Sequence, residues 1–467
     1  MNILVTCPGC GTHNPQSNVY CSRCRSTLER GAWVSEKEAR RILAALARRG
    51  LGSRLRKRAL QAILAVLVVA WVSSTAYDIW NHPDQPTTQI GAEAAPGDWP
   101  MFQRDLRHTG FVPNSTFRPR GETQWVYESD RAIVASPVVV EQVVYLTTRA
   151  PNDHKIVALD ADTGRRLWER PASAPVDGSM SVAGGLVFVT MRNGTVLALN
   201  SSDGTVKWEL DADAPLFTTP TVHRGFVYVG TFDKRLLLLD AATGEVLSDR
   251  YVGFKVTSEP VVNDHVVAFR SQDNRVYILD ALTGRQKMYY GTRQIAGSLV
   301  LSGDSLYTAD IKGGLRALDW TKVLFPLETA MRTVRVNLFV WGLGSFPGLK
   351  GNVWRRTRQG HSFLGTPAVG DGMVYAASRS GKVFKVGEFD GEPVWSYDMG
   401  AEPSKTVAVT AEYLFVGDAD GRLHAIDVGT GEPELELQLD GAISAGPVVA
   451  NDMLYVATLA GKLYAIR

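Results

Sequence analysis

The chain has 467 residues and a formal net charge of +2, enough for several domains or for one large repeat fold with attachments. The charge is uneven, because residues 1–58 carry 12 Lys and Arg against 3 Asp and Glu, whereas the rest of the chain is acidic. All four cysteines precede residue 25, which excludes a disulfide in the remaining chain.

The first predicted element is a small zinc ribbon over residues 1–30. Two Cys-x-x-Cys pairs are separated by ten residues and consist of Cys7 with Cys10 and Cys21 with Cys24. Four thiolates at this spacing can surround one Zn²⁺ as a tetrahedron, and the metal would supply the folding free energy that so short a segment lacks. Two disulfides or a redox Cys-x-x-Cys pair are the alternatives. A four-thiolate site leaves no open coordination position, so the predicted role of the zinc is structural.

A short helix and a membrane span are predicted next. Ser35 and Glu38 form a capping box, which predicts a cytoplasmic helix over 35–50. Residues 59–80 begin with nineteen uncharged residues, which span ~28 Å as a helix, and we predict a single transmembrane helix there. Basic residues before it predict a cytoplasmic N-terminus, and hence a single-pass anchor in the cytoplasmic membrane with the rest of the chain outside. A signal peptide cleaved after Ala76 is the alternative.

A linker over 81–97 and a repeat array over 98–467 complete the predicted organisation. Four segments share an apolar run followed by a turn that ends in Gly, and their Asp or Asn residues lie forty apart, at Asp160, Asn200, Asp240 and Asp280. Four more repeats end at Asp319, Gly387, Asp427 and Arg467. The total is eight repeats, a number and a period that indicate a closed repeat fold.

Each repeat reads as four short strands separated by turn residues. This pattern predicts an all-β fold, an eight-bladed β-propeller of four-stranded blades. The last repeat stops after its third strand, and the segment Gly121–Tyr127, which has the Gly-x-x-x-Trp spacing of the other repeats, is predicted to supply its fourth and close the ring. The interval between Asp319 and Gly387 breaks the period, which places an insertion at 321–350 in the fifth repeat.

The repeat carries a recognisable motif, Ala-x-Asp-x-x-Thr-Gly-x-x-x-Trp from Ala158 to Trp168. It resembles the Trp-docking motif of the pyrroloquinoline-quinone (PQQ) propeller superfamily, and Asp98–Gly110 is similar to the opening of BamB-like chains. The resemblance covers about 98–467 and implies a tryptophan at the blade junctions. The docking position holds Trp125, Trp168, Trp208 and Trp395. In three other repeats it holds Ser248, Met288 or Leu435 in place of tryptophan. The insertion leaves open whether Trp354 takes this position in the fifth repeat.

The superfamily includes PQQ-dependent dehydrogenases and non-enzymatic BamB-like propellers. The resemblance implies that such a dehydrogenase uses a vicinal disulfide, a Ca²⁺ site and a catalytic Asp, and no cysteine follows Cys24 here. We therefore predict a non-catalytic, extracytoplasmic scaffold that binds a protein of the cell envelope, with no catalytic or cofactor-binding residue and no nucleic-acid partner. A PQQ-dependent dehydrogenase and a ligand sensor that signals to the zinc ribbon are the alternatives. The apolar, basic insertion 321–350 is expected to contact a partner or lipid, or to cap the propeller.

Overall fold

The computed structural model describes two compact parts of the chain. The described residues are 4–7, 10–15, 21–23, 33–34, 41, 61–69, 71–73, 76, 82–292, 297–322, 328–345, 350–358 and 360–467. One unit comprises Met1–Trp80 with Leu324–Leu349, and the other comprises Asn81–Val323 with Lys350–Arg467. Most of the predicted ribbon and helices, including all of 35–50 except Arg41, lie outside the described residues.

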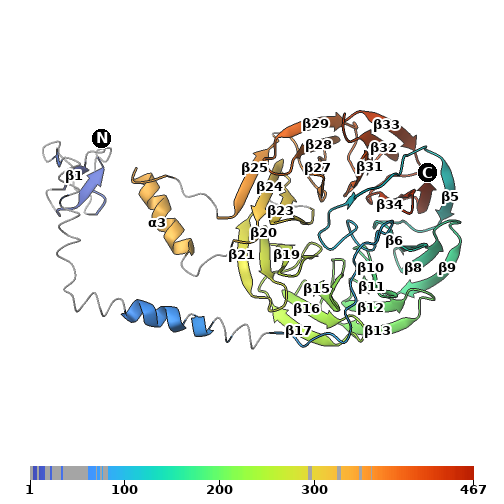
Figure 1. Ribbon diagram of the computed structural model, residues 1–467, viewed down its shortest axis with the longest axis horizontal. Helices are drawn as coiled ribbons and strands as arrows, with labels where there is room; N and C mark the ends of the chain where they lie inside the picture. The colour runs from blue at the N-terminus through green and yellow to red at the C-terminus, as the bar shows by residue number, and fades with distance from the viewer. Residues whose placement is uncertain are drawn as a thin grey trace. The chain divides into compact units, whose positions relative to one another are not determined.

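The second unit is a ring of eight antiparallel sheets (Figure 1). The first four blades are β6–β9 (Val138–Val140, Val143–Ala150, Asp153–Asp160, Arg166–Ala172), β10–β13 (Ser181–Ala183, Leu186–Thr190, Thr195–Asn200, Val206–Asp211), β14–β17 (Thr221–His223, Phe226–Gly230, Arg235–Asp240, Val246–Tyr251) and β18–β21 (Val261–Val262, Val266–Ser271, Arg275–Asp280, Gln286–Gly291).

The remaining blades follow the same order of strands, from the inner to the outer one. They are β22–β25 (Val300–Ser302, Ser305–Ala309, Gly314–Asp319, Asn352–Thr357), β26–β29 (Ala368–Gly370, Met373–Ala377, Lys382–Gly387, Pro393–Asp398), β30–β33 (Ala408–Thr410, Tyr413–Gly417, Arg422–Asp427, Pro433–Gln438) and β34–β36 (Val448–Ala450, Met453–Ala457, Lys462–Ile466) with β5 (Thr123–Glu128). The predicted all-β propeller of eight four-stranded blades is confirmed.

Burial explains the sequence of the strands. The second and third strands of a blade are covered on both faces by the neighbouring blades, so β11 and β15 are buried at every residue and read as apolar runs. The outer strands β29 and β33 alternate between exposed and half-buried residues because only one of their faces meets a neighbour.

An N-terminal strand closes the ring, as predicted. Strand β5 pairs antiparallel with β36, and Trp125 lies opposite Ala465. The backbone of Arg467 accepts hydrogen bonds from the N–H groups of Arg120 and Glu122 at 2.8 and 3.1 Å. The outer edge of β36 is therefore covered, and an unpaired edge between the last and first blades is avoided.

Five blade junctions are made by tryptophans on outer strands. Each indole Nε1 donates to a carbonyl oxygen of the next blade, and the pairs are Trp125–Ala161 (2.9 Å), Trp168–Ser201 (2.8 Å), Trp208–Ala241 (3.0 Å), Trp354–Glu388 (2.8 Å) and Trp395–Val428 (2.8 Å). These contacts also establish the register of Trp354. Trp354 in β25 lies opposite Ala317 in β24, as Trp168 in β9 lies opposite Ala158 in β8. The insertion lies between β24 and β25 and leaves the fifth blade's outer strand intact.

The segment 90–112, which we call the plug segment, touches the inner strand region of all eight blades. Backbone hydrogen bonds of 2.7–3.1 Å join it to one residue of each blade. In blade order the pairs are Trp99–Val139, Pro100–Val182, Ala92–Val222, Leu106–Val262, Arg107–Leu301, Thr109–Val369, Gly110–Val409 and Gly97–Asn451. It ends in β4 (Phe111–Val112), which runs parallel to β30. In Figure 1 it is the blue segment that crosses the ring near its centre.

The predicted linker 81–97 also differs from expectation. Of these residues, 82–97 are described and belong to the propeller unit. Thr87 donates its backbone N–H and its hydroxyl to the carboxylate of Asp240, at 2.5 and 3.1 Å, and Gly225 donates to the carbonyl of Ile90 at 2.6 Å. Its Pro, Thr and Gln content resembles that of a linker, yet backbone and hydroxyl bonds hold it to the third blade.

The first unit contributes short elements. Strands β1 (Leu4–Thr6), β2 (His13–Pro15) and β3 (Trp33–Val34) form a sheet in the order β2-β1-β3, and the insertion contains helix α3 (Glu328–Val340). Within the predicted span 59–80, residues 61–69, 71–73 and 76 are described and are helical. In the part of the chain that the structure describes, no helix is long and apolar enough to cross a membrane.

Candidate functional site

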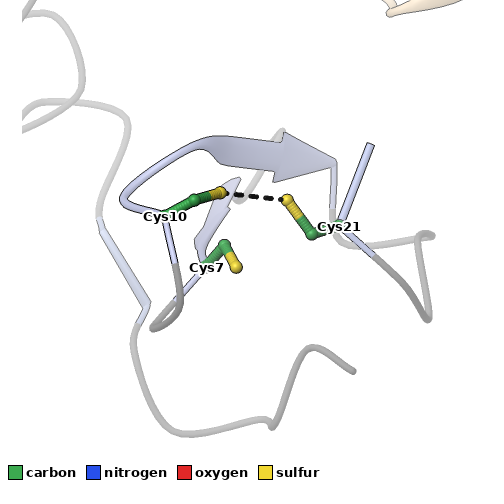
Figure 2. A group of neighbouring side chains, drawn as sticks. All are labelled: Cys7, Cys10 and Cys21. Carbon is green, nitrogen blue, oxygen red and sulfur yellow. Dashed lines mark hydrogen bonds between the residues drawn. The ribbon is translucent and has the colours of Figure 1, made fainter. Parts of the chain in front are cut away.

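Three of the four predicted ligands converge in the first unit. The sulfur atoms of Cys7, Cys10 and Cys21 all lie within 4.8 Å of one another. Figure 2 shows the three side chains beside the small sheet. Cys10 Sγ and Cys21 Sγ are 3.5 Å apart, far beyond the ~2.05 Å of a disulfide, so they are not covalently joined. The fourth predicted ligand, Cys24, lies outside the described residues.

A tight turn brings the first two sulfurs together. The N–H of Gly11 donates to the carbonyl of Cys7, and the N–H of Cys7 donates to the carbonyl of Thr12, both at 2.9 Å. Gly11 takes φ of +69°, a left-handed conformation that glycine adopts without strain. The turn follows β1 directly, so the sheet fixes where Cys7 and Cys10 project.

Asn14 joins this turn to the second cysteine pair, a role that the sequence did not reveal. Its side chain is fully buried, its Nδ2 donates to the carbonyl of Thr12 at 2.9 Å and approaches Cys21 Sγ at 3.5 Å, and its Oδ1 accepts the N–H of Ser22 at 2.8 Å. The N–H of Arg23 also points at Cys21 Sγ, at 3.4 Å. Donors aimed at a sulfur stabilise its thiolate form.

The geometry fits a metal ion. Four thiolates at ~2.3 Å from Zn²⁺ in a tetrahedron stand ~3.8 Å from one another, and the separations of the three described sulfurs are compatible with that spacing. The three cysteines can therefore hold a metal. Cys21 is buried and has the N–H donors of Asn14 and Arg23 beside its sulfur, an outer-shell arrangement that metal sites use.

The plug segment gathers a second set of buried polar groups. Arg104 and His108 are both buried, and burial lowers the pKa of each. His108 Nδ1 lies 3.2 Å from the carbonyl oxygen of Leu299, and Gln103 Nε2 donates to the carbonyl of Thr366 at 3.4 Å. Desolvation favours the neutral imidazole, so His108 contributes no fixed charge to the centre of the ring near neutral pH.

The propeller matches a known family over most of its length. A family model described as outer membrane protein assembly factor BamB matches residues 115–322, 350–431 and 379–467. The chain belongs to this BamB family. The match begins after the plug segment and omits the insertion that contains α3.

Individual BamB relatives are distant and are matched only in part. The BamB protein of Burkholderia pseudomallei is 31% identical over 160 residues, which cover 29% of this chain and 40% of that protein. The BamB protein of Shewanella oneidensis is 25% identical over 166 residues, which cover 35% of this chain and 34% of that protein. The chain thus spans less than half of the length of either relative.

Solved structures share the ring but differ in chemistry. The crystal structure of BamB from Moraxella catarrhalis has a TM-score of 0.57 and 18% identity, and the match covers 74% of this chain and 96% of that one. A europium-containing methanol dehydrogenase has a TM-score of 0.62 and 13% identity, with 79% and 98% covered. At these identities the likeness concerns the fold alone.

Proposed function

We propose that the chain is a membrane-anchored, non-catalytic scaffold that binds a protein partner in the cell envelope. Membership of the BamB family carries the proposal, because the relatives are named as outer membrane protein assembly factors. A propeller suits such a role, since its ring is rigid and its loops and outer strands offer many surfaces to partners.

The residues of the ring favour a scaffold over a PQQ-dependent dehydrogenase. No cysteine follows Cys24, so the propeller contains no vicinal pair to lie against a quinone. The plug segment also crosses the ring and bonds to every blade near the centre, which gives the ring a rigid core of backbone contacts. Both features argue for a surface that binds and against a pocket that catalyses.

The anchor and the orientation belong to the same proposal. Residues 61–69 are helical, and side chains such as Ile63, Leu64 and Val66 are exposed, which suits contact with lipid. The excess of Lys and Arg over residues 1–58 favours a cytoplasmic N-terminus with an extracytoplasmic propeller. In this arrangement the cytoplasmic ribbon holds one structural Zn²⁺ through Cys7, Cys10, Cys21 and Cys24.

Two measurements test the proposal. Crosslinking in intact cells, followed by identification of captured proteins, should recover one dominant envelope protein with the full chain. A thermal shift with PQQ and Ca²⁺ should leave the melting temperature unchanged, because stabilisation by a ligand requires binding to the folded state. A strong PQQ-dependent stabilisation, or the absence of any captured envelope protein, contradicts the scaffold.

Orientation has a separate test. A reporter enzyme that works only outside the cytoplasm should be active when fused after Arg467 and silent when fused before Ser35. The reverse pattern contradicts the orientation, and a mature N-terminus at Tyr77 contradicts the uncleaved anchor.

A further inference from the structure

A cavity of about 600 Å³ lies beside the plug segment at the eighth blade. Its walls come from Ala94, Pro96 and Gly97, from residues 112–116 and 449–452, and from Arg104. A volume of this size falls within the ~300–1,000 Å³ range of small-ligand pockets. The walls combine apolar residues with neutral polar ones, and the charged side chains among the lining residues are Arg104 and Asp452.

Arg104 is a buried cation whose hydrogen-bonding capacity is only partly used. Its exposed fraction is 8%, and burial lowers its pKa. Nη1 donates to the carbonyl oxygen of Phe111 at 3.2 Å, whereas Nε has no hydrogen-bond partner among the residues that the structure describes. A guanidinium presents five N–H donors in a planar fork, and leaving them unpaired away from water is costly.

Arg104 pairs with a carboxylate through one long contact and not through a bidentate one. Asp105 Oδ2 lies 3.9 Å from Arg104 Nη1, but it already accepts the hydroxyl of Thr109 at 2.5 Å. The other oxygen of Asp105 accepts the N–H groups of Arg107 and Thr109 at 3.0 and 3.1 Å. Asp98 attracts Arg104 at longer range, while its own Oδ1 accepts the N–H of Glu141 at 2.8 Å. The fork of Arg104 therefore lacks the bidentate carboxylate that it is shaped to bind.

The backbone holds Arg104 in an unusual conformation. Gln103 and Arg104 have φ of +52° and +75°, two consecutive left-handed residues that are not glycine. Such conformations persist only where the surroundings impose them, and they concentrate at binding sites. Local backbone bonds hold this turn, since the N–H of Arg104 donates to the carbonyl of Met101 and the N–H of Gly110 donates to the carbonyl of Gln103, both at 3.0 Å. Arg104 lines the cavity from this turn.

We propose that this cavity binds a carboxylate, with the guanidinium of Arg104 as its anchor. The polar groups of Asn114, Ser115 and Thr116 in the wall offer further donors. One cation and the nearby Asp452 suit a single negative charge better than a phosphate dianion. The carboxylate comes from a small organic acid or from the C-terminus of a polypeptide. The carboxylate site does not depend on the proposed scaffold function, so a result that contradicts the scaffold leaves the carboxylate site standing.

Calorimetric titration of the purified full-length chain tests the site. The probes are butyrate, acetyl-tetraalanine with a free C-terminal carboxylate, and the same peptide as its C-terminal amide. We expect saturable binding of at least one carboxylate and none of the amide. Binding of the free-acid peptide alone identifies a polypeptide C-terminus, and binding of butyrate alone or of both identifies access for small acids. Absence of binding by both carboxylates overturns the proposal.

Matched variants locate the binding. Arg104→Met keeps an apolar stem but removes the charge, and should lower the affinity for the carboxylate at least tenfold. Arg120→Met removes an exposed arginine that does not line the cavity and should leave affinity unchanged. Should Arg104→Met fail to fold, Thr116→Trp narrows the cavity from an exposed wall residue and should also abolish binding. Parental affinity in a correctly folded Arg104→Met or Thr116→Trp variant overturns the assignment.

Discussion

The indole Nε1 of Trp125 donates a 2.9 Å hydrogen bond to the carbonyl oxygen of Ala161 and thereby joins the last blade to the first. The ring of Trp125 also lies over Gly164, because a Cβ on that glycine would come within 2.5 Å of Trp125 Cε3. Gly164 has φ of +68°, so the turn needs glycine for its backbone as well as for the space above it. A single tryptophan–glycine contact thus fixes both the turn and the junction.

Loss of this contact should weaken ring closure. We expect Trp125→Ala to lower the free energy of unfolding by about 3–5 kcal/mol, as for other Trp-to-Ala truncations. Val126→Ala, at an exposed position on the same strand, should change it by less than about 1 kcal/mol. Denaturant unfolding of both variants gives the comparison. Equal stability of the two would show that the Trp125 contact does not hold the ring closed.

The plug segment should be sensitive to added volume at Gly110. Gly110 has φ of +62°, and a Cβ there would collide with Gln103 Oε1. Gly185 has φ of +76° with open space around it, so Gly185→Ala suffers the backbone strain alone. We expect Gly110→Ala to cost about 1–3 kcal/mol more than Gly185→Ala in thermal unfolding. A smaller cost at Gly110 would mean that the plug segment yields easily.

The turn aspartates should make the propeller sensitive to acid. The hydroxyl and N–H of Thr163 lower the pKa of Asp160 from its ordinary value of 3.8, and the N–H of Thr430 does the same for Asp427. Because the folded pKa is the lower one, this stabilisation is present above pH 3.8 and disappears as the pH falls through the folded values. Melting temperatures measured from about pH 5 down to about pH 2 should therefore decline.

An amide substitution isolates the charge in that decline. Asp160→Asn combined with Asp427→Asn should flatten the acid slope, since Asn200 shows that the repeat accepts an amide at this position. Asp162→Asn, an exposed change in the first of these turns, should leave the slope unchanged. An unchanged slope in the double variant would place the acid sensitivity elsewhere in the chain.

The cysteine cluster should bind one zinc per chain. Cys10→Ser should release the metal, and chelation should unfold residues 1–30 while the propeller keeps its melting temperature, because the metal supplies the folding energy of so small a unit. Elemental analysis and separate melting transitions provide the measurement. Asn14→Leu, which keeps all four thiols, should weaken metal binding about 10–100-fold. Full-length protein without stoichiometric zinc would contradict the ribbon.

The insertion should contribute to association and not to folding. Helix α3 and the residues after it expose Val334, Val340 and Trp341, and Arg332 and Arg335 give the helix a basic character. Replacing 324–349 with a Gly-Ser loop should change the propeller's melting temperature by no more than about 1–2 °C. The reason is that β24 and β25 pair directly with each other and include none of the replaced residues. Association with a partner or with anionic vesicles should be lost. Strong destabilisation with unchanged association would identify a structural cap.

Side-chain patterns made the propeller predictable. The period of forty residues, the Gly-x-x-x-Trp spacing at Trp125 and the alternating strands all follow from how a blade buries its faces, so blade number and closure could be read directly. The three described cysteines converge for a similar reason, since a Cys-x-x-Cys spacing is itself a geometric constraint.

Contacts made by the backbone left no such pattern. The plug segment bonds to eight blades through carbonyls and N–H groups, which every residue carries, so its sequence could not distinguish it from a loop. Asn14 and Arg104 act through a few contacts specific to their own positions, which leave no periodic pattern in the sequence. Helix α3 was not predicted because its Thr, Val and Asn residues are weak helix formers.

Closure by β5 also dictates an order of events during synthesis. The strand that begins at Thr123 is made before any complete blade, yet its pairing partner β36 is made after every other described strand of the ring. The plug segment likewise acquires its partners one blade at a time. A growing chain therefore keeps a strand edge available until β36 has been made, and such edges invite pairing with other chains. The exposed interval lengthens with every pause in translation, so the yield of folded protein should depend on how quickly the last blade follows the first.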